Sequence, residues 1–103
     1  MIKVYHNRRF IEYDMGSHFI DSTNLTLVAV VETDDLDRAF ELTQHLDQSW
    51  QLNPGITFSE PTARSSSVGD VLVWLGMAYV IEGIGFRPLR HLDIRDLPKA
   101  EGF

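Results

Sequence analysis

The residues best suited to binding or catalysis lie in one stretch, Arg64-Ser65-Ser66-Ser67-Val68-Gly69-Asp70. Serine hydroxyls beside a carboxylate and a guanidinium can bind a ligand or shape a turn. No G-x-S-x-G motif is present to place a serine on the strained turn that activates it in many hydrolases. The stretch suits a turn, because Gly69 tolerates positive φ while Asp70 and the serines accept backbone amides. We predict a turn that starts a strand, with ligand or partner contact as the alternative.

The candidate contact residues are the serine loop, its flanking charges and one aromatic residue on the strand that follows. They are Arg64, Ser65, Ser66, Ser67, Asp70 and Trp74. We expect Arg64 to pair with Asp70 at the rim of the domain, where an exposed ion pair contributes little to stability. No residue is predicted to be catalytic.

Other chemistry finds little support in the residue pattern. The four histidines, His6, His18, His45 and His91, do not form a helical i, i+4 pair or an H-E-x-x-H motif. The chain has no cysteine, which removes thiolate zinc sites and cysteine nucleophiles. Gly83 and Gly85 lack the third glycine and following helix of a dinucleotide site. We therefore predict no metal and no cofactor, and we favour a non-enzymatic protein, with a small enzyme as the alternative.

The charge balance is acidic, with 9 basic and 15 acidic residues and a net charge of −6. Such a surface repels phosphate backbones at long range, so general nucleic-acid binding is disfavoured. Arg87, Arg90 and Arg95 near the C-terminal end can still form a local basic patch. Nucleic-acid binding through these three residues is the weakest alternative, because neighbouring aspartates also explain them as a solvated segment.

The apolar pattern predicts five strands and one helix. The strands are expected near 2–6, 10–13, 25–32, 71–75 and 78–82, and the segment 56–67 is expected to be a loop. Leu25 to Glu32 is apolar on both faces, which places it inside the sheet. The helix is expected over 35–49, because Leu36, Ala39, Phe40, Thr43, Leu46 and Trp50 form one stripe at helical spacing.

Local signals place the ends of this helix. Thr33, Asp34 or Asp35 can cap its first turn, and the sequence Asn53-Pro54-Gly55 follows its end. We expect Leu36, Phe40 and Leu46 to pack on the sheet. Trp50 is expected in the core, with an exposed aromatic anchor as the alternative.

These elements predict a single α+β domain over residues 1–98 and a frayed tail over 99–103. The sheet is expected to be small and mostly antiparallel, with four to five strands and one main amphipathic helix packed on one face. One helix leaves the other face to be covered by the segment 89–97, the loop 56–63 or a second molecule. We favour an interface there, with a homodimer as the default.

No apolar run is long enough to span a membrane, and no secretory signal opens the chain. Together with the missing cysteines, this favours a cytoplasmic location.

The segment from Arg64 through S-V-G-D-V, then Ala78-Tyr79-Val80 and Gly85-Phe86, resembles the YodL-like family of small bacterial proteins. Leu36, Ala39, Phe40, Thr43, Trp50 and Asn53 also resemble that family's layout, so the resemblance covers about residues 25–88. It implies a bacterial origin, often on a phage, plasmid or conjugative element. It implies no catalytic residues.

Two functional hypotheses follow. The first is a small non-enzymatic protein-interaction or regulatory module that modulates a host system. The second is a small ligand- or nucleotide-binding domain, or an enzyme, that uses the serine loop around Ser65–Asp70.

Overall fold

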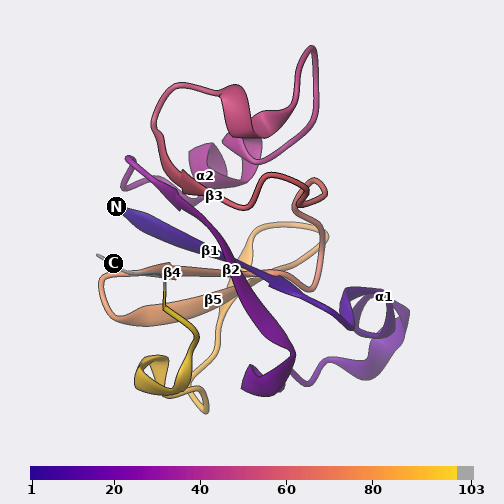
Figure 1. Cartoon of the computed structure of the whole chain (residues 1–103). Helices are drawn as coiled ribbons and strands as arrows, with labels where there is room; N and C mark the ends of the chain where they lie inside the picture. Colours follow the sequence, from indigo (N-terminus) through magenta and orange to yellow (C-terminus); the bar gives the residue numbers. More distant parts are fainter. Residues whose placement is uncertain (100–103) are drawn as a thin grey trace.

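The fold is a six-stranded antiparallel sheet with short helical segments around it (Figure 1). A computed structural model describes residues 1–99. The strand order is β3-β2-β1-β4-β5-β6. The strands are β1 (Ile2–Asn7), β2 (Leu25–Val31), β3 (Ile56–Ser59), β4 (Val71–Trp74), β5 (Met77–Ile81) and β6 (Phe86–Pro88).

The helical segments are all short. They are α1 (Phe10–Glu12), a π-helical turn η1 (Tyr13–Ser17), α2 (Leu36–Leu42) and the 3-10 turns η2 (Ser22–Asn24), η3 (Trp50–Leu52) and η4 (Ile94–Asp96). No helix within residues 1–99 is long and apolar enough to cross a membrane.

The predicted fold class, four to five strands with one main amphipathic helix, is therefore wrong. The sheet has six strands and its longest flanking helix has seven residues. Residues 10–13 are helical, not extended, and part of the predicted loop 56–67 forms the edge strand β3. A four-residue edge strand after Pro54-Gly55 carries too little alternation to be distinguished from a loop by pattern alone.

The helix α2 begins where a capping residue was expected and ends earlier than its apolar stripe. The Asp35 carboxylate accepts hydrogen bonds from the Asp37 and Arg38 amides, which confirms one of the three predicted caps. At the other end, the Thr43 hydroxyl donates to the carbonyls of Ala39 and Phe40. The predicted helix 35–49 thus stops at Leu42. Leu46 is 76% exposed, so its predicted packing on the sheet is wrong.

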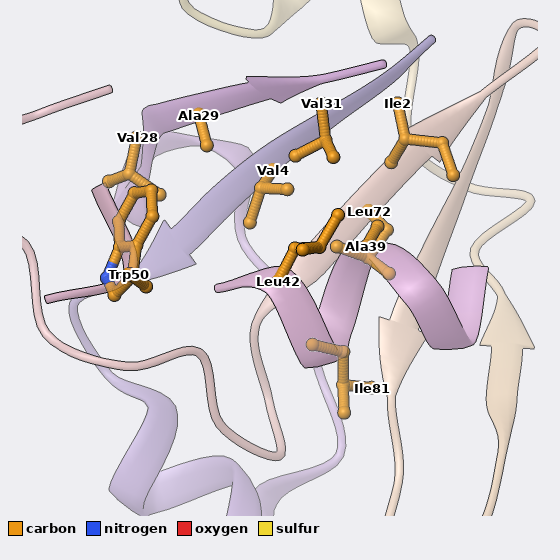
Figure 2. Close-up of a cluster of buried hydrophobic side chains, with 10 residues drawn as sticks. All are labelled: Ile2, Val4, Val28, Ala29, Val31, Ala39, Leu42, Trp50, Leu72 and Ile81. Atoms are coloured by element: carbon orange, nitrogen blue, oxygen red, sulfur yellow. The ribbon is translucent and has the colours of Figure 1, made fainter. Parts of the chain in front are cut away.

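One core lies between the sheet and α2 (Figure 2). Ala39 and Leu42 from α2 approach the strands there, and Trp50 is completely buried, which confirms its predicted place in the core. Leu36 and Phe40 are partly buried and pack against this cluster. Alternation along β4 sends Leu72 into this core and Val71 into a second one.

The second core is covered by the chain itself. Leu89 and Leu97 from the C-terminal segment are buried there with Ile20, and Leu92 and Ile94 pack against the cluster. The Tyr5 hydroxyl donates to the Pro98 carbonyl at 2.9 Å and fastens the segment to β1. The favoured explanation, that another molecule covers this sheet face, is therefore wrong. Of the predicted frayed tail, 99–103, only Lys99 belongs to the described residues, and residues 100–103 lie outside them.

Candidate functional site

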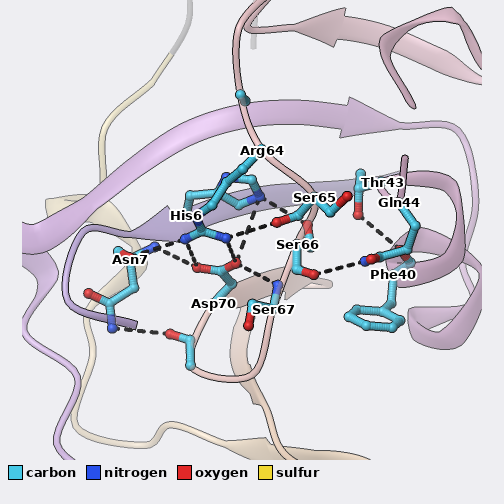
Figure 3. A network of polar contacts seen from close by, with 12 residues as sticks. His6, Asn7, Phe40, Thr43, Gln44, Arg64, Ser65, Ser66, Ser67 and Asp70 are labelled. Carbon is cyan, nitrogen blue, oxygen red and sulfur yellow. Dashed lines mark hydrogen bonds and ion pairs between the residues drawn. The ribbon is translucent and has the colours of Figure 1, made fainter. Parts of the chain in front are cut away.

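The serine loop closes around one completely buried carboxylate, that of Asp70 (Figure 3). Arg64 donates to both of its oxygens, at 2.6 Å and 2.8 Å. The Asn7 and Ser67 amides also donate to it, each at 2.8 Å. Four donors therefore hold the charge of Asp70, and they come from β1 and from both ends of the loop.

Arg64 links this carboxylate to the helical segment after β1. Its guanidinium lies 3.7 Å from the centre of the Phe10 ring, a cation–π distance. It also donates to the carbonyls of Ser65 at 2.9 Å and Asn7 at 3.3 Å. The expected weak rim pair is thus a bidentate ion pair on a buried charge. Removing one partner of such a pair leaves the other charge buried and uncompensated.

His6 and Ser66 complete the network without forming a catalytic triad. The His6 Nε2 atom shares a hydrogen bond with the Ser66 hydroxyl at 3.0 Å and lies 3.8 Å from Asp70 Oδ2. A triad needs the carboxylate on the other ring nitrogen, so that the histidine can accept the serine proton. Here one nitrogen faces both groups, and the arrangement does not activate the serine.

Burial controls the protonation of His6. Loss of hydration lowers the pKa of His6 to about 4, and the Asp70 charge, which acts in the opposite direction, does not cancel it. The Arg64 charge lowers the pKa further. The imidazole is therefore neutral at pH 7 and acts as a hydrogen-bonding group of the core.

The serine loop is also bound to the end of α2. The Ser65 hydroxyl accepts from the His45 amide at 2.8 Å, and the Ser66 amide donates to the Thr43 carbonyl at 3.0 Å. The Gln44 side-chain amide donates to the Ser66 carbonyl at 2.9 Å. These contacts use the loop's polar groups to join α2 to β4, and the same contacts divert the chain from a longer helix.

Gly69 confirms the predicted turn. Its φ is +91°, and a Cβ there would lie 3.0 Å from the Tyr13 Cβ and 3.1 Å from the Phe10 carbonyl oxygen. Its carbonyl accepts from the Asn7 side-chain amide at 3.1 Å. Only glycine satisfies both the backbone angle and this close approach.

The structure brings together five of the six predicted contact residues, namely Arg64, Ser65, Ser66, Ser67 and Asp70. Trp74 lies apart, at the far end of β4, and its indole donates to Asp34 at 3.3 Å. Sequence reasoning missed His6 and Asn7 as members of the network. A signal for His6 existed, because it continues the inward phase of Ile2 and Val4, where a polar residue needs a partner.

Two of the three arginines of the predicted basic patch are paired with carboxylates. Arg87 pairs with Glu82 at 2.9 Å and also donates to the Tyr13 hydroxyl at 3.1 Å. Arg95 pairs with Asp93 at 2.7 Å on the C-terminal segment. Arg90 is exposed between them in sequence. Two of the three guanidiniums thus neutralise carboxylates of the chain itself, and they do so on different elements.

A separate cleft of about 460 Å³ opens beside the end of β1, between the helical segment after β1 and η2. Arg9, Glu12, Tyr13, Phe19 and Asp21 are among its lining residues. Arg9 pairs with Glu12 at 2.9 Å, and Asp21 accepts from the Thr23 amide at 2.9 Å. Within residues 1–99 no group of three histidine, aspartate or glutamate side chains is placed to hold a metal ion.

No protein-family model, no curated protein and no solved structure matches this chain.

Proposed function

We propose that this protein is a small interaction module that binds another protein and performs no chemistry of its own. The observation that carries the proposal is the state of the Asp70 network. The Asp70 carboxylate accepts hydrogen bonds from four donors. His6 and Ser66 share a hydrogen bond, and the serine loop is hydrogen-bonded to the chain at the end of α2. The polar residues best suited to chemistry therefore hold β1, β4 and α2 together.

The surface offers a place for a partner on the helical segment after β1. Ile11 and Met15 on this segment expose 59% and 82% of their surface, and Phe19, just past its end, exposes 66%. Ile11 and Met15 are four residues apart on a helical stretch, so they share one face. Exposed apolar side chains that gather in one region mark protein-interaction sites more often than scattered ones do.

The resemblance to the YodL-like family adds context to this proposal. A cytoplasmic bacterial protein of about this size, encoded on a phage, plasmid or conjugative element, would act by binding and modulating a host protein. The closed network is consistent with that role, because it gives a small domain a fixed shape around which a binding surface can be presented.

The test uses the purified chain and two matched variants. Proteins retained from a bacterial lysate are identified, produced separately and titrated against the chain by calorimetry. Met15→Asp combined with Phe19→Asp should abolish binding of a true partner, whereas Leu52→Asp, at a residue that is 70% exposed elsewhere, should not. Equal binding by both variants would show that the partner does not bind this surface. Saturable turnover of a small molecule would contradict a non-enzymatic function.

Ligand binding is the second candidate function. The cleft beside β1 is a better candidate for the ligand site than the serine loop is. A volume of about 460 Å³ falls in the range of small-molecule sites. Thermal-shift titrations with nucleotides and divalent cations test it. A saturable rise in melting temperature that Arg9→Ala removes would support the ligand-binding candidate over the interaction module.

A further inference from the structure

One wall of the cleft beside β1 comes from the helical segment after β1, and its polar side chains use only some of their hydrogen-bonding atoms. Arg9 donates to Glu12 through Nη1 alone, at 2.9 Å. The Nε and Nη2 atoms of Arg9, which form one fork of the planar guanidinium, have no partner within residues 1–99. The second oxygen of Glu12 has none there either. This wall therefore offers two adjacent donors with an acceptor beside them.

The opposite wall, formed by Asp21 and η2, offers a second acceptor. The Oδ1 atom of Asp21 accepts hydrogen bonds from the Thr23 amide at 2.9 Å and from the Thr23 hydroxyl at 2.8 Å. The Oδ2 atom has no partner in the described part of the chain. The bonds from Thr23 and the nearby charge of Arg9 lower the pKa of Asp21. The carboxylate therefore stays ionised at neutral pH and keeps an accepting oxygen.

An aromatic ring completes the lining of the cleft. One side of the Phe19 ring stacks on His91, with ring centroids 5.2 Å apart and an angle of 24° between the rings. The His91 Nε2 atom donates to the Ile20 carbonyl at 3.0 Å, which holds the stack in place. Phe19 is nevertheless 66% exposed, so a second face of its ring is open to a flat ligand.

Both walls are fastened to neighbouring elements. The Tyr13 hydroxyl donates to Glu82 at 2.9 Å and ties the helical segment to the end of β5. On the other side, the Arg8 guanidinium donates to the Thr23 carbonyl at 2.6 Å and ties η2 to the end of β1. The cleft, with a volume of about 460 Å³, is therefore a preformed site, as most small-molecule sites are.

A flat ligand that stacks on Phe19 must also match the two donors and the two acceptors of the walls. Nucleobases have this character, because each has a π-face for stacking and edges that form hydrogen bonds. Guanine carries two adjacent acceptors, O6 and N7, which match an arginine fork, and its N1 and N2 donors match carboxylates. Adenine places a donor next to an acceptor, so it matches an amide better than a fork.

We infer that this cleft binds the guanine base of a nucleoside, with Arg9 donating to O6 and N7 and the ring lying on the open face of Phe19. Glu12 and Asp21 are the acceptors for N1 and N2. Because the lining has two carboxylates and one guanidinium, phosphate groups gain no attraction from it, and the base carries the recognition. The inference rests on the second candidate function, ligand binding at this cleft, and names its ligand.

The experiment is an NMR titration of the isotope-labelled full chain with guanosine, adenosine and cytidine. Guanosine should shift the Thr23 and Asn24 amides in a saturable way. Adenosine and cytidine should bind about tenfold more weakly or worse, because each mismatches the Arg9 fork or the carboxylates. Guanosine triphosphate should bind no more tightly than guanosine. Absence of saturable shifts with guanosine overturns the inference, and so does adenosine binding of equal strength.

Matched variants locate the site. Arg9→Lys keeps the charge but loses the fork, so it should weaken guanosine binding by about tenfold, whereas Arg38→Lys, in another exposed ion pair, should not. Phe19→Ala should weaken binding of all three nucleosides, and Ile84→Ala, at a residue that is 97% exposed elsewhere, should weaken none. Guanosine binding that Arg9→Lys leaves unchanged overturns the inference.

The outcomes separate this inference from the functions proposed above. A saturable ligand at the cleft other than guanosine would overturn the guanine assignment and keep ligand binding. Silence with these nucleosides and in the thermal-shift titrations would overturn both. Met15→Asp changes the partner surface outside the cleft lining, so it should leave guanosine binding unchanged whether or not a protein partner is found.

Discussion

The two ends of β4 both have a residue with positive φ, but only one of these residues is a type that suits it. Before the strand, Gly69 adopts φ +91° and lets the chain approach Tyr13 closely, while the adjacent Asp70 is buried with four donors. After the strand, Leu75 adopts φ +48° with most of its surface in solvent. At the first end, the residue types agree with the backbone angle and with burial. At the second end, a leucine suits neither the positive φ nor the exposure to solvent.

The contrast distinguishes residues that stabilise the domain from a residue that destabilises it. Sequences generally agree with their fold at each level, and local conflicts tend to mark function. By that criterion the chemically suggestive serine loop is structural, whereas folding of the isolated domain does not explain the leucine at the hairpin tip. Substitutions at the two ends should therefore change stability in opposite directions.

The largest effect is expected at the buried carboxylate. Asp70→Ala removes the acceptor of four donors and leaves the Arg64 guanidinium without its partner, so it should cost about 3–5 kcal/mol of unfolding free energy. Urea titration followed by circular dichroism measures it. Glu41→Ala is the matched control, because that carboxylate forms an exposed pair with Arg38 and should change stability by less than about 1 kcal/mol. A similar small loss for both would show that the network is not structural.

The second effect is a loss of stability in mild acid that comes from His6. Its folded pKa is about 4, below the ordinary value of 6.5. The unfolded chain therefore binds a proton first as pH falls, so this contribution is complete above about pH 6.5 and declines down to about pH 4. The decline amounts to about 3 kcal/mol.

Unfolding free energies measured between these pH values test the His6 contribution. His6→Asn keeps a polar side chain but removes the titration, so its curve should lie lower at pH 7 and be flatter in this window. Parallel curves for the two proteins would assign the acid sensitivity to other groups.

The third effect concerns Gly69. Gly69→Ala adds a Cβ at 3.0 Å from the Tyr13 Cβ and forces alanine into a positive φ, so we expect a loss of about 2 kcal/mol. Gly55→Ala is a useful control, since φ is +90° there as well but no atom lies within 4 Å of the added Cβ. The difference between the two variants isolates the close approach to Tyr13. Equal losses would mean that backbone angle alone sets the requirement at Gly69.

Local turn chemistry was predictable from sequence, and long-range pairing was not. The S-V-G-D-V pattern indicated the Gly69 turn, and the acidic residues before Leu36 indicated the cap of α2. The early end of α2 depends on Ser65 and Ser66, which bind residues just past it from about twenty positions away. No helical periodicity contains that information, so the stripe through Leu46 predicted a helix twice as long.

The candidate site shows the same division between local and distant information. Arg64 and Asp70 are six residues apart, and their pairing was expected, but its burial was not. Burial follows from β1, because β1 lies next to β4 in the sheet and places His6 and Asn7 over the carboxylate. Strand order is a property of the whole chain. A sequence reading that leaves β1 and β4 unpaired therefore places the ion pair at the rim.

The smallest effect is the one that most sharply distinguishes the two ends of β4. Leu75→Gly removes the strain of a leucine at φ +48° and an exposed apolar side chain, so the monomer should gain about 1 kcal/mol. Glycine also loosens the unfolded chain, which offsets part of that gain. Leu75→Asn avoids most of this offset, and the pair of variants brackets the strain itself. Urea titration at low micromolar concentration measures the monomer alone. A gain here beside a loss at Gly69→Ala shows that the two ends of β4 differ in how the residue type suits the positive φ. A loss for both tip variants would mean that Leu75 packs within its own chain, and the tip would then be as structural as the Asp70 network at the other end of the strand.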